Sequence, residues 1–332
     1  MYYSVILPTY GRPGDVEEFL DSLEKQEYKN FEIIIVDATP DDSVRRVADT
    51  YHDRLNLHFI YKKGLGISES RNLGVSQSKG DYVVFIDSDC VVPPSYFSRI
   101  EKYLSLNKAD VFGGPDAASE DFSATQKAIN YVMTSFLTTG GIRGKAKRVG
   151  RFEPRSFNMG VSRKAFDAVG GYSGMKVAED IDLSMRFRKA GFKTELIPEA
   201  YVYHKRKTSL YKFLVQMFMY GKARVDLFIR HREALKITYL APLFFLFYLA
   251  AGVAFAFLSR VLFILFLATL FIYALAVFID SSVQNRSPVA GTLSVFAAFG
   301  FLICYGAGLI YNIFRRVILG RKEIERAKIL KI

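Results

Sequence analysis

The sequence predicts an α/β domain followed by an all-α membrane region. Over residues 1–204, short apolar runs that end in polar or turn residues alternate with helix-like segments, which is the pattern of a mainly parallel sheet covered by helices. From Ile237 onwards the composition becomes almost wholly apolar. At 332 residues the chain exceeds a typical single domain, so we expect two parts.

The first half of the α/β region shows strict alternation. Pro8 ends the first apolar run, and Asp37 ends the second. The alternating elements are expected, in order, at residues 4–8 (strand), 16–27 (helix), 31–36 (strand), 43–51 (helix), 57–61 (strand) and 68–76 (helix). The glycines near residue 65 lack the G-x-G-x-x-G spacing and do not follow the first strand, which argues against a nicotinamide or flavin enzyme.

The most informative stretch is 80–90, GDYVVFIDSDC. Its apolar run is typical of a strand that is buried on both faces, and the run ends in Asp87, Ser88 and Asp89. Carboxylates at the carboxyl end of such a strand lie where open α/β sheets bind ligands. Their oxygens suit Mg²⁺ or Mn²⁺, which in turn hold phosphates. An acidic turn without a ligand is the alternative.

Charge and cysteine content exclude several classes of protein. The net charge of +12 indicates phosphate-bearing partners or an anionic membrane surface, and the apolar segments favour the membrane over nucleic acid. The two cysteines, Cys90 and Cys304, cannot form a disulfide framework or a cysteine-rich metal site. The N-terminus enters a strand at once, so we expect no cleavable signal peptide and a cytoplasmic first domain.

Several stretches in this order resemble a known family. VILPTYGR, IIIVDATPDDS and GISESRNLGVSQSKGDYVVFIDSDC are similar to the nucleotide-binding half of the family 2 glycosyltransferases, which have the GT-A fold. The resemblance covers about residues 4–232. It implies a hexosyltransferase-type enzyme with a GT-A domain at 1–204, divided into a nucleotide-sugar half (1–112) and an acceptor half (113–204).

The resemblance also implies a donor site. In the family, Asp37 would contact the nucleobase, Asp87 the ribose, and Asp89 the metal that carries the diphosphate. His204 after the last strand would contact the metal or the diphosphate. Asp-Ala-Thr replaces the usual Asp-Asp-Gly-Ser at the base contact, and a UDP-sugar is favoured over a GDP-sugar. The remaining donor residues by resemblance are Pro8, Thr9, Tyr10, Arg12, Arg71, Asn72 and Ser88.

The acceptor side is expected after residue 113. By resemblance, Asn158 and Met159 enter the acceptor site and Gly171 and Tyr172 precede the family's Glu-Asp motif. A carboxylate pair at a helix start, here Glu179 and Asp180, is by itself an ordinary dipole cap. The family assigns Asp180 as the general base and Glu179 as its support, with inversion at the anomeric carbon.

Basic segments surround the acceptor side. The loop 143–155 carries six Lys or Arg residues, and it is either a solvated loop or one that closes over the diphosphate or meets an anionic lipid. Residues 205–236 form a basic amphipathic segment that is expected at the membrane interface. Gln216 and Tyr220 resemble the pattern of non-processive members, and the Q-x-x-R-W motif of polysaccharide synthases is absent.

The membrane region is expected over 237–314, with helices at 237–258, 261–279 and 289–314 and a basic tail at 315–332. Burial of these helices in a large soluble core is the weaker alternative. Three full crossings would place the basic tail outside, against the positive-inside rule, so the third segment either crosses or stays re-entrant or shallow.

These expectations combine into one function. The protein would be an inverting, metal-dependent enzyme of the cytoplasmic (plasma or inner) membrane that is multi-pass and moves one sugar to a membrane-associated, lipid-linked acceptor in glycolipid or exopolysaccharide assembly. Anionic lipids would be further partners. The first alternative is a catalytically inactive GT-A-like membrane scaffold. The second is a nucleotidyltransferase, which would need a glycine-rich basic loop where the chain has only Gly11–Gly14.

Overall fold

The computed structural model of the protein describes residues 1–117, 122–140, 152–205 and 209–321. The chain divides into two compact units. Unit 1 comprises Met1–Ser119 and Gly150–Lys205, and unit 2 comprises Glu120–Val149 and Arg206–Ile332. The division departs from the predicted continuous domain 1–204 at residues 120–149. These residues belong to unit 2 because helix α5 (Ala124–Thr134) packs on helix α12 (Pro288–Ile313).

Unit 1 is built on a seven-stranded mixed sheet with the order β3-β2-β1-β4-β8-β6-β9. Strands β1 to β4 are parallel to one another, as the alternating pattern predicts, and β8 is antiparallel to both β4 and β6. The strands are β1 (Tyr3–Thr9), β2 (Phe31–Asp37), β3 (Leu57–Tyr61), β4 (Tyr82–Ile86), β6 (Val111–Gly113), β8 (Asn158–Ser162) and β9 (Thr194–Leu196).

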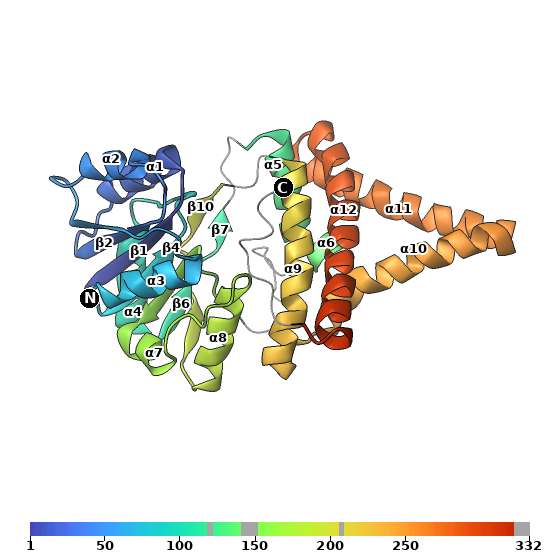
Figure 1. Ribbon diagram of the computed structural model, residues 1–332. Coiled ribbons are helices and arrows are strands. Elements are labelled where there is room, and N and C mark those ends of the chain that lie inside the picture. The colour runs from blue at the N-terminus through green and yellow to red at the C-terminus, as the bar shows by residue number, and fades with distance from the viewer. Residues whose placement is uncertain (118–121, 141–151, 206–208, 322–332) are drawn as a thin grey trace. The chain divides into compact units, whose positions relative to one another are not determined.

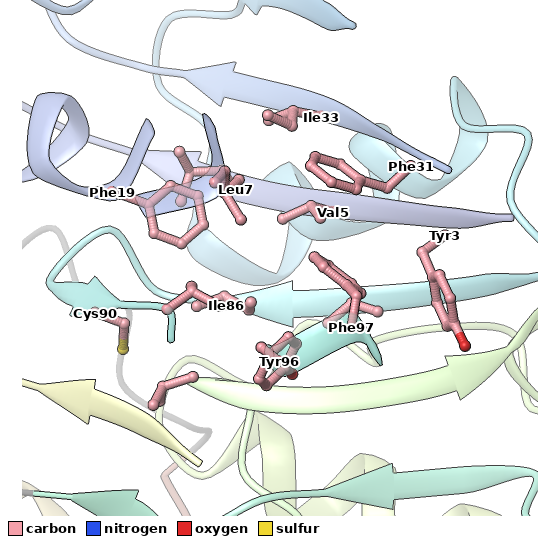
Figure 2. Packing of buried hydrophobic residues seen from close by; sticks show 14 of the residues in the cluster. Tyr3, Val5, Leu7, Phe19, Phe31, Ile33, Ile86, Cys90, Tyr96 and Phe97 are labelled. Carbon is pink, nitrogen blue, oxygen red and sulfur yellow. The ribbon is translucent and has the colours of Figure 1, made fainter. Parts of the chain in front are cut away.

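Helices cover both faces of this sheet. Because successive side chains of a strand point to opposite faces, Tyr3, Val5 and Leu7 of β1 enter one core cluster and Ile6 enters the other. Figure 2 shows the first cluster, in which Phe19 and Phe97 pack against β1. The helices of unit 1 are α1 (Pro13–Glu24), α2 (Ser43–Asp49), α3 (Ile67–Ser76), α4 (Tyr96–Leu106), α7 (Arg163–Ala168) and α8 (Glu179–Lys189).

A small second sheet joins distant parts of unit 1. Its order is β5-β10-β7, with β5 at Cys90–Val91, β10 at Val202–His204 and β7 at Asp116–Ala117. The antiparallel register between β10 and β5 pairs His204 with Cys90. This pairing brings the end of the predicted domain beside the Asp-Ser-Asp turn.

Unit 2 is helical (Figure 1). Three of its segments are long and apolar enough to cross a membrane: Ile237–Leu258, Arg260–Asn285 and Pro288–Ile318. The second continues past its predicted end at residue 279. The described elements of unit 2 are α5, α6 (Phe136–Thr139), α9 (Leu210–Arg230), η1 (Arg232–Ala234), η2 (Ile237–Leu240), α10 (Ala241–Leu258), α11 (Arg260–Asn285), α12 and the π-helix η3 (Phe314–Ile318).

Helix α9, which forms most of the predicted interfacial segment 205–236, packs along α12 (Figure 1). Phe213 and Met217 of α9 are buried in a cluster with Ala297 and Ala298 of α12. Phe213 and Met217, two of the apolar residues of the segment, are therefore covered by protein, and the expected place of the segment at the membrane interface stays a prediction. The π-helix at the end of α12 carries part of the predicted basic tail, and residues 322–332 of that tail lie outside the described residues.

Candidate active site

A buried arginine connects the two predicted halves of the site. Arg71 lies on α3 and is 1% exposed. Its Nη2 donates to Asp87 Oδ1 at 2.9 Å, and its Nη1 donates to Glu179 Oε1 at 2.9 Å. The guanidinium also lies over the ring of Tyr172, at 5.3 Å from the centroid. One side chain thus joins the turn after β4 to the first residue of α8.

Burial and charge act against each other in this cluster. Burial disfavours the charged form of Arg71, but Tyr172, Asp87 and Glu179 favour it and raise the pKa of the guanidinium above its ordinary value. Burial raises the pKa of Glu179, although the charge of Arg71 partly opposes this effect and the charge of Asp180 adds to it. The arrangement is a buried ion-pair network, in which removal of one partner leaves an uncompensated charge.

The start of helix α8 is conformationally unusual. Its N-cap residue, Ala178, adopts φ +64°, a left-handed conformation that is rare for residues other than glycine. The next two residues are the predicted catalytic pair. Asp180 Oδ1 accepts from the backbone N–H of Ile181 at 2.8 Å and lies 3.5 Å from Nη1 of Arg155. Strained backbone of this kind concentrates at functional sites.

Asp89 faces a different set of partners from Asp87. The backbone N–H of Cys90 donates to Asp87 O at 3.1 Å and closes the turn between them. Asp89 Oδ1 lies 3.3 Å from Nε2 of His204, and Asp89 Oδ2 lies 3.3 Å from Nη1 of Arg12. The two carboxylates of the motif are therefore separated into an Arg71 side and a His204 side.

Asp89, Cys90 and His204 offer ligand atoms that lie within 4.8 Å of one another. A carboxylate oxygen and an imidazole nitrogen suit Mn²⁺, and the carboxylate suits Mg²⁺. Cys90 suits these ions poorly, since burial, first of all, raises the pKa of its thiol well above the ordinary value and the thiolate is the ligand form. The donor set of Asp89 and His204 thus fits the predicted divalent cation.

The imidazole of His204 is held from two directions. The ring stacks on Phe157, with centroids 4.9 Å apart, and its Nδ1 lies 3.9 Å from Asp116 Oδ2 on β7. A carboxylate on the far nitrogen of a ligating histidine orients the ring toward the metal. Sequence reasoning missed Asp116. Its position directly after a strand and the Gly113-Gly114 pair was the available signal.

The end of β2 forms a second polar centre in unit 1. Asp37 is 1% exposed, and its Oδ1 accepts from Thr9 Oγ1 at 2.8 Å and from Thr39 Oγ1 at 2.6 Å. Thr39 Oγ1 also accepts from the backbone N–H of Gly11 at 2.7 Å. The Asp-Ala-Thr variant therefore has a structural consequence: Thr39 fixes the carboxylate of Asp37 and the loop after β1 together.

Two of the predicted acceptor residues, Asn158 and Met159, are buried and contact other parts of the fold. Asn158 is 1% exposed; its Oδ1 accepts from Tyr96 Oη at 2.6 Å and its Nδ2 donates to Ala200 O at 2.7 Å. Met159 is fully buried in the core cluster between β4 and β6. Both side chains connect elements of the fold, so their expected contact with an acceptor stays a prediction without geometric support.

The other predicted acceptor pair, Gly171 and Tyr172, adjoins the Arg71 network. Gly171 has φ +67°, and a Cβ there would lie 2.6 Å from Asn72 Oδ1. Asn72 exchanges two hydrogen bonds with the backbone of Tyr172, both at 2.9 Å, and Tyr172 Oη bonds Ser156 Oγ at 2.7 Å. Asn72 and Gly171 thus place the Tyr172 ring beneath Arg71.

The remaining predicted donor residues are all at least partly exposed. Tyr10 is 69% exposed, Pro8 and Ser88 are partly exposed, and Arg12 is the N-cap of α1. The basic loop 143–155 lies mostly outside the described residues, and of its six basic side chains only Arg155 is described.

Comparison with known proteins identifies the family of the chain. Residues 4–170, half of the chain, match the family described as Glycosyl transferase family 2. The chain belongs to this family. The resemblance found in the sequence is confirmed, and so is the GT-A fold class with a helical region that carries three apolar helices.

Individual relatives of this family 2 glycosyltransferase cover different shares of it. The succinoglycan biosynthesis protein ExoA of Rhizobium meliloti is 24% identical over 245 residues, which is 72% of this chain and 74% of ExoA. The uncharacterized glycosyltransferase EpsJ of Bacillus subtilis is 35% identical over 112 residues, so the match spans about a third of each protein (33% and 32%).

Among solved structures, the mannosyltransferase PcManGT from Pyrobaculum calidifontis, in complex with GDP-Man and Mn²⁺, has the same fold. Its TM-score is 0.66 at 18% identity, and the alignment covers 95% of this chain and 87% of PcManGT.

Proposed function

We propose that this family 2 glycosyltransferase moves a single sugar from a nucleotide sugar to a membrane-associated, lipid-linked acceptor, with inversion at the anomeric carbon. The observation that carries the proposal is the buried bridge through Arg71. It couples Asp87, on the donor side, to Glu179, which begins the helix that also presents Asp180.

The chemistry assigns a role to each carboxylate. Asp180 takes the proton of the acceptor hydroxyl while its oxygen attacks the anomeric carbon, and the bond from that carbon to the diphosphate oxygen breaks. Because one displacement occurs, the configuration inverts. Glu179 is already paired with Arg71. Asp180, at the same helix N-terminus, has a longer ion pair, 3.5 Å to Arg155 against 2.9 Å for Glu179 to Arg71, and is therefore the better base.

The donor diphosphate belongs on the other side of the turn. Asp89 and His204 would hold Mn²⁺ or Mg²⁺, and Asp116 would orient the imidazole. When bound, the cation supplies positive charge that stabilises the departing diphosphate. Arg12, 3.3 Å from Asp89, adds a second positive charge beside the same place.

Other features of the chain indicate the nucleobase of the donor and the nature of the acceptor. Asp37, fixed by Thr9 and Thr39, favours a UDP-sugar by resemblance, whereas the solved mannosyltransferase binds GDP-Man. The apolar helices support a lipid-linked acceptor, and the name of ExoA supports a role in polysaccharide assembly. The basic residues between 205 and 236 favour a catalytic unit on the cytoplasmic face of the plasma or inner membrane.

Calorimetric titration of the full chain in detergent with UDP and with GDP, each with and without Mn²⁺, tests the donor site. We expect metal-dependent binding of UDP that Asp89→Asn abolishes and that Asp180→Asn retains. Turnover of the matching nucleotide sugar should fall by about 10²- to 10⁴-fold in Asp180→Asn, the usual loss for a general base. Asp167→Asn is the matched control, because Asp167 is exposed on α7.

Each result has a separate meaning. Preference for GDP would redirect the search to GDP-sugars. Retained turnover in Asp180→Asn would show that another group is the base. Failure to bind either nucleotide would overturn the proposed transfer and favour the scaffold.

A further inference from the structure

The third apolar helix, α12, is accompanied along most of its length by the charged helix α9. Both helices run in the same direction, since Leu214 of α9 lies against Gly300 and Asp226 of α9 bonds Asn312. Between these two contacts, a Cβ at Gly308 of α12 would lie 2.2 Å from the backbone oxygen of Phe218 of α9. The two backbones therefore approach as closely as glycine permits, and α9 and α12 form one closely packed helix pair.

Helix α9 is not built to cross a bilayer. Over Leu210–Arg230 it carries Lys212, Lys222, Arg224, Asp226 and Arg230. Each charge at the centre of a membrane helix costs about 2.5–3.5 kcal/mol on the insertion scale. If α12 crossed the hydrocarbon core, α9 would be carried across with it.

Polar bonds fix α12 to the charged part of α9. Asn312 is fully buried, and its Nδ2 donates to Lys222 O at 2.7 Å and to Asp226 Oδ2 at 3.0 Å. Arg316 Nε lies 2.8 Å from Asp226 Oδ1. The two helices thus cannot separate without leaving buried polar groups unpaired.

Helices α10 and α11 behave differently. They meet α12 near their bases, where Pro242 lies against Gly306 and Ser281 Oγ bonds Ser294 Oγ at 2.7 Å. Beyond that point they project away from α12 as a hairpin (Figure 1), and at its tip Phe257 and Leu258 are 87% and 76% exposed. With 18 residues, α10 is about 27 Å long, close to the thickness of the hydrocarbon core.

The face of α12 opposite α9 is also apolar and open. Val289, Phe296, Ile303 and Ile310 are 62%, 63%, 41% and 43% exposed. Spaced seven residues apart, they form one stripe along the helix. Asn312, on the α9 side, lies on the other face, since nine residues from Ile303 correspond to half a turn beyond two full turns.

We propose that the chain crosses the bilayer twice, through the α10–α11 hairpin, and that α12 lies along the membrane surface. Its stripe faces the lipid and α9 covers its water side. The chain then leaves α12 on the side where it entered α10. Arg315, Arg316 and Arg321 consequently lie on the same side as the basic residues of α9, as the positive-inside rule favours.

Cysteine accessibility tests this topology without reference to transfer activity. In a Cys90→Ser/Cys304→Ser background, single cysteines replace Lys108 (exposed in unit 1), Ser259 (the hairpin tip) or Arg321 (after α12). A membrane-impermeant maleimide is applied to sealed vesicles of each orientation. We expect the cysteines at 108 and 321 to be labelled from one side and the cysteine at 259 from the other.

Other patterns overturn the proposal. Labelling of 321 together with 259 would show that α12 is a third crossing, and labelling of all three from one side would show that the hairpin does not cross. Protease protection of a C-terminal tag on the unsubstituted chain gives the same distinction without relying on the cysteine-free variant: a tag cleaved from the side of unit 1 is expected, and a tag protected there contradicts two crossings.

Discussion

At the scale of single residues, the candidate site depends on one buried guanidinium. Arg71 connects a carboxylate after β4 with a carboxylate 92 positions later that begins α8. Such a network stabilises the fold only while all of its members are present, because each buried charge is compensated by the others. Two predictions follow from this dependence.

Arg71→Met should lower the free energy of unfolding by about 3–5 kcal/mol, since Asp87 and Glu179 would lose their shared cation. Arg71→Lys should keep the positive charge but lose the simultaneous hydrogen bonds to Asp87 and Glu179, and should therefore be intermediate in stability between Arg71→Met and the unsubstituted protein. Thermal unfolding followed by circular dichroism in detergent measures both. The control is Arg54→Met, which removes an exposed ion pair with Glu24 and should cost about 1 kcal/mol or less. Equal losses of unfolding free energy for Arg71→Met and Arg54→Met would show that the buried bridge contributes no more to stability than an exposed ion pair.

Glu179→Gln should change the pH dependence of stability. Because burial raises the pKa of Glu179, the folded protein binds its proton more tightly than the unfolded chain does. The contribution of Glu179 to stability is therefore full below the ordinary glutamate pKa, about 4.3, and decreases as the pH rises through the raised value.

The unfolding midpoint of the unsubstituted protein should thus fall relative to that of Glu179→Gln over this window of rising pH. Glu199→Gln, which alters an exposed side chain, is the control and should follow the unsubstituted protein at every pH. A constant difference between Glu179→Gln and the unsubstituted protein would contradict the raised pKa.

At the scale of elements, strand pairing and helix contact bring together what the sequence separates. The register of β10 against β5 places His204 opposite Cys90, so that its imidazole reaches Asp89. In unit 2, Gly221 and Gly308 allow α9 and α12 to approach closely: a Cβ at either would meet backbone atoms of the other helix at 2.1 and 2.2 Å. Small residues serve the same purpose between membrane helices.

Gly308→Ala should push α9 away from α12 and lower the stability of unit 2 by about 1–3 kcal/mol, the usual cost of overpacking. The added methyl group would meet backbone atoms of Phe218 and Lys222, which cannot rotate away as a side chain can. Thermal unfolding in detergent measures the effect. Gly14→Ala in α1 is the matched control, because a Cβ there has no atom within 4 Å and alanine favours the helix. Equal midpoints for the two variants would contradict the close approach.

At the scale of the whole molecule, a basic chain is combined with an apolar hairpin. The net charge of +12 favours an anionic leaflet, and the helices of the hairpin are long and apolar enough to cross a membrane. We expect the unfolding midpoint to be higher in nanodiscs that contain phosphatidylglycerol than in pure phosphatidylcholine. The difference should shrink between 0.1 M and 1 M salt, because the screening length falls from about 10 Å to about 3 Å. A difference that persists at 1 M salt would indicate a cause other than surface charge.

The sequence by itself determined the features that depend only on residues close together in the chain. Apolar runs that end at Asp37 and Asp87 indicated strands of an open sheet and the edge where a ligand binds, and the ordered motifs indicated the family. The length of the apolar segments indicated membrane helices in the same way. Periodicity and turn chemistry are local properties, so they can be read without knowing which elements pack together.

The tertiary structure decided everything that depends on pairing between distant segments. It joined Arg71 to Glu179, placed Asp116 behind His204, and buried Asn158 between Tyr96 and Ala200. It also assigned α5 to the helical unit and covered α9 with α12. Residues this far apart in the sequence meet only through sheet register and helix contact, and the free energy of those contacts depends on both segments together.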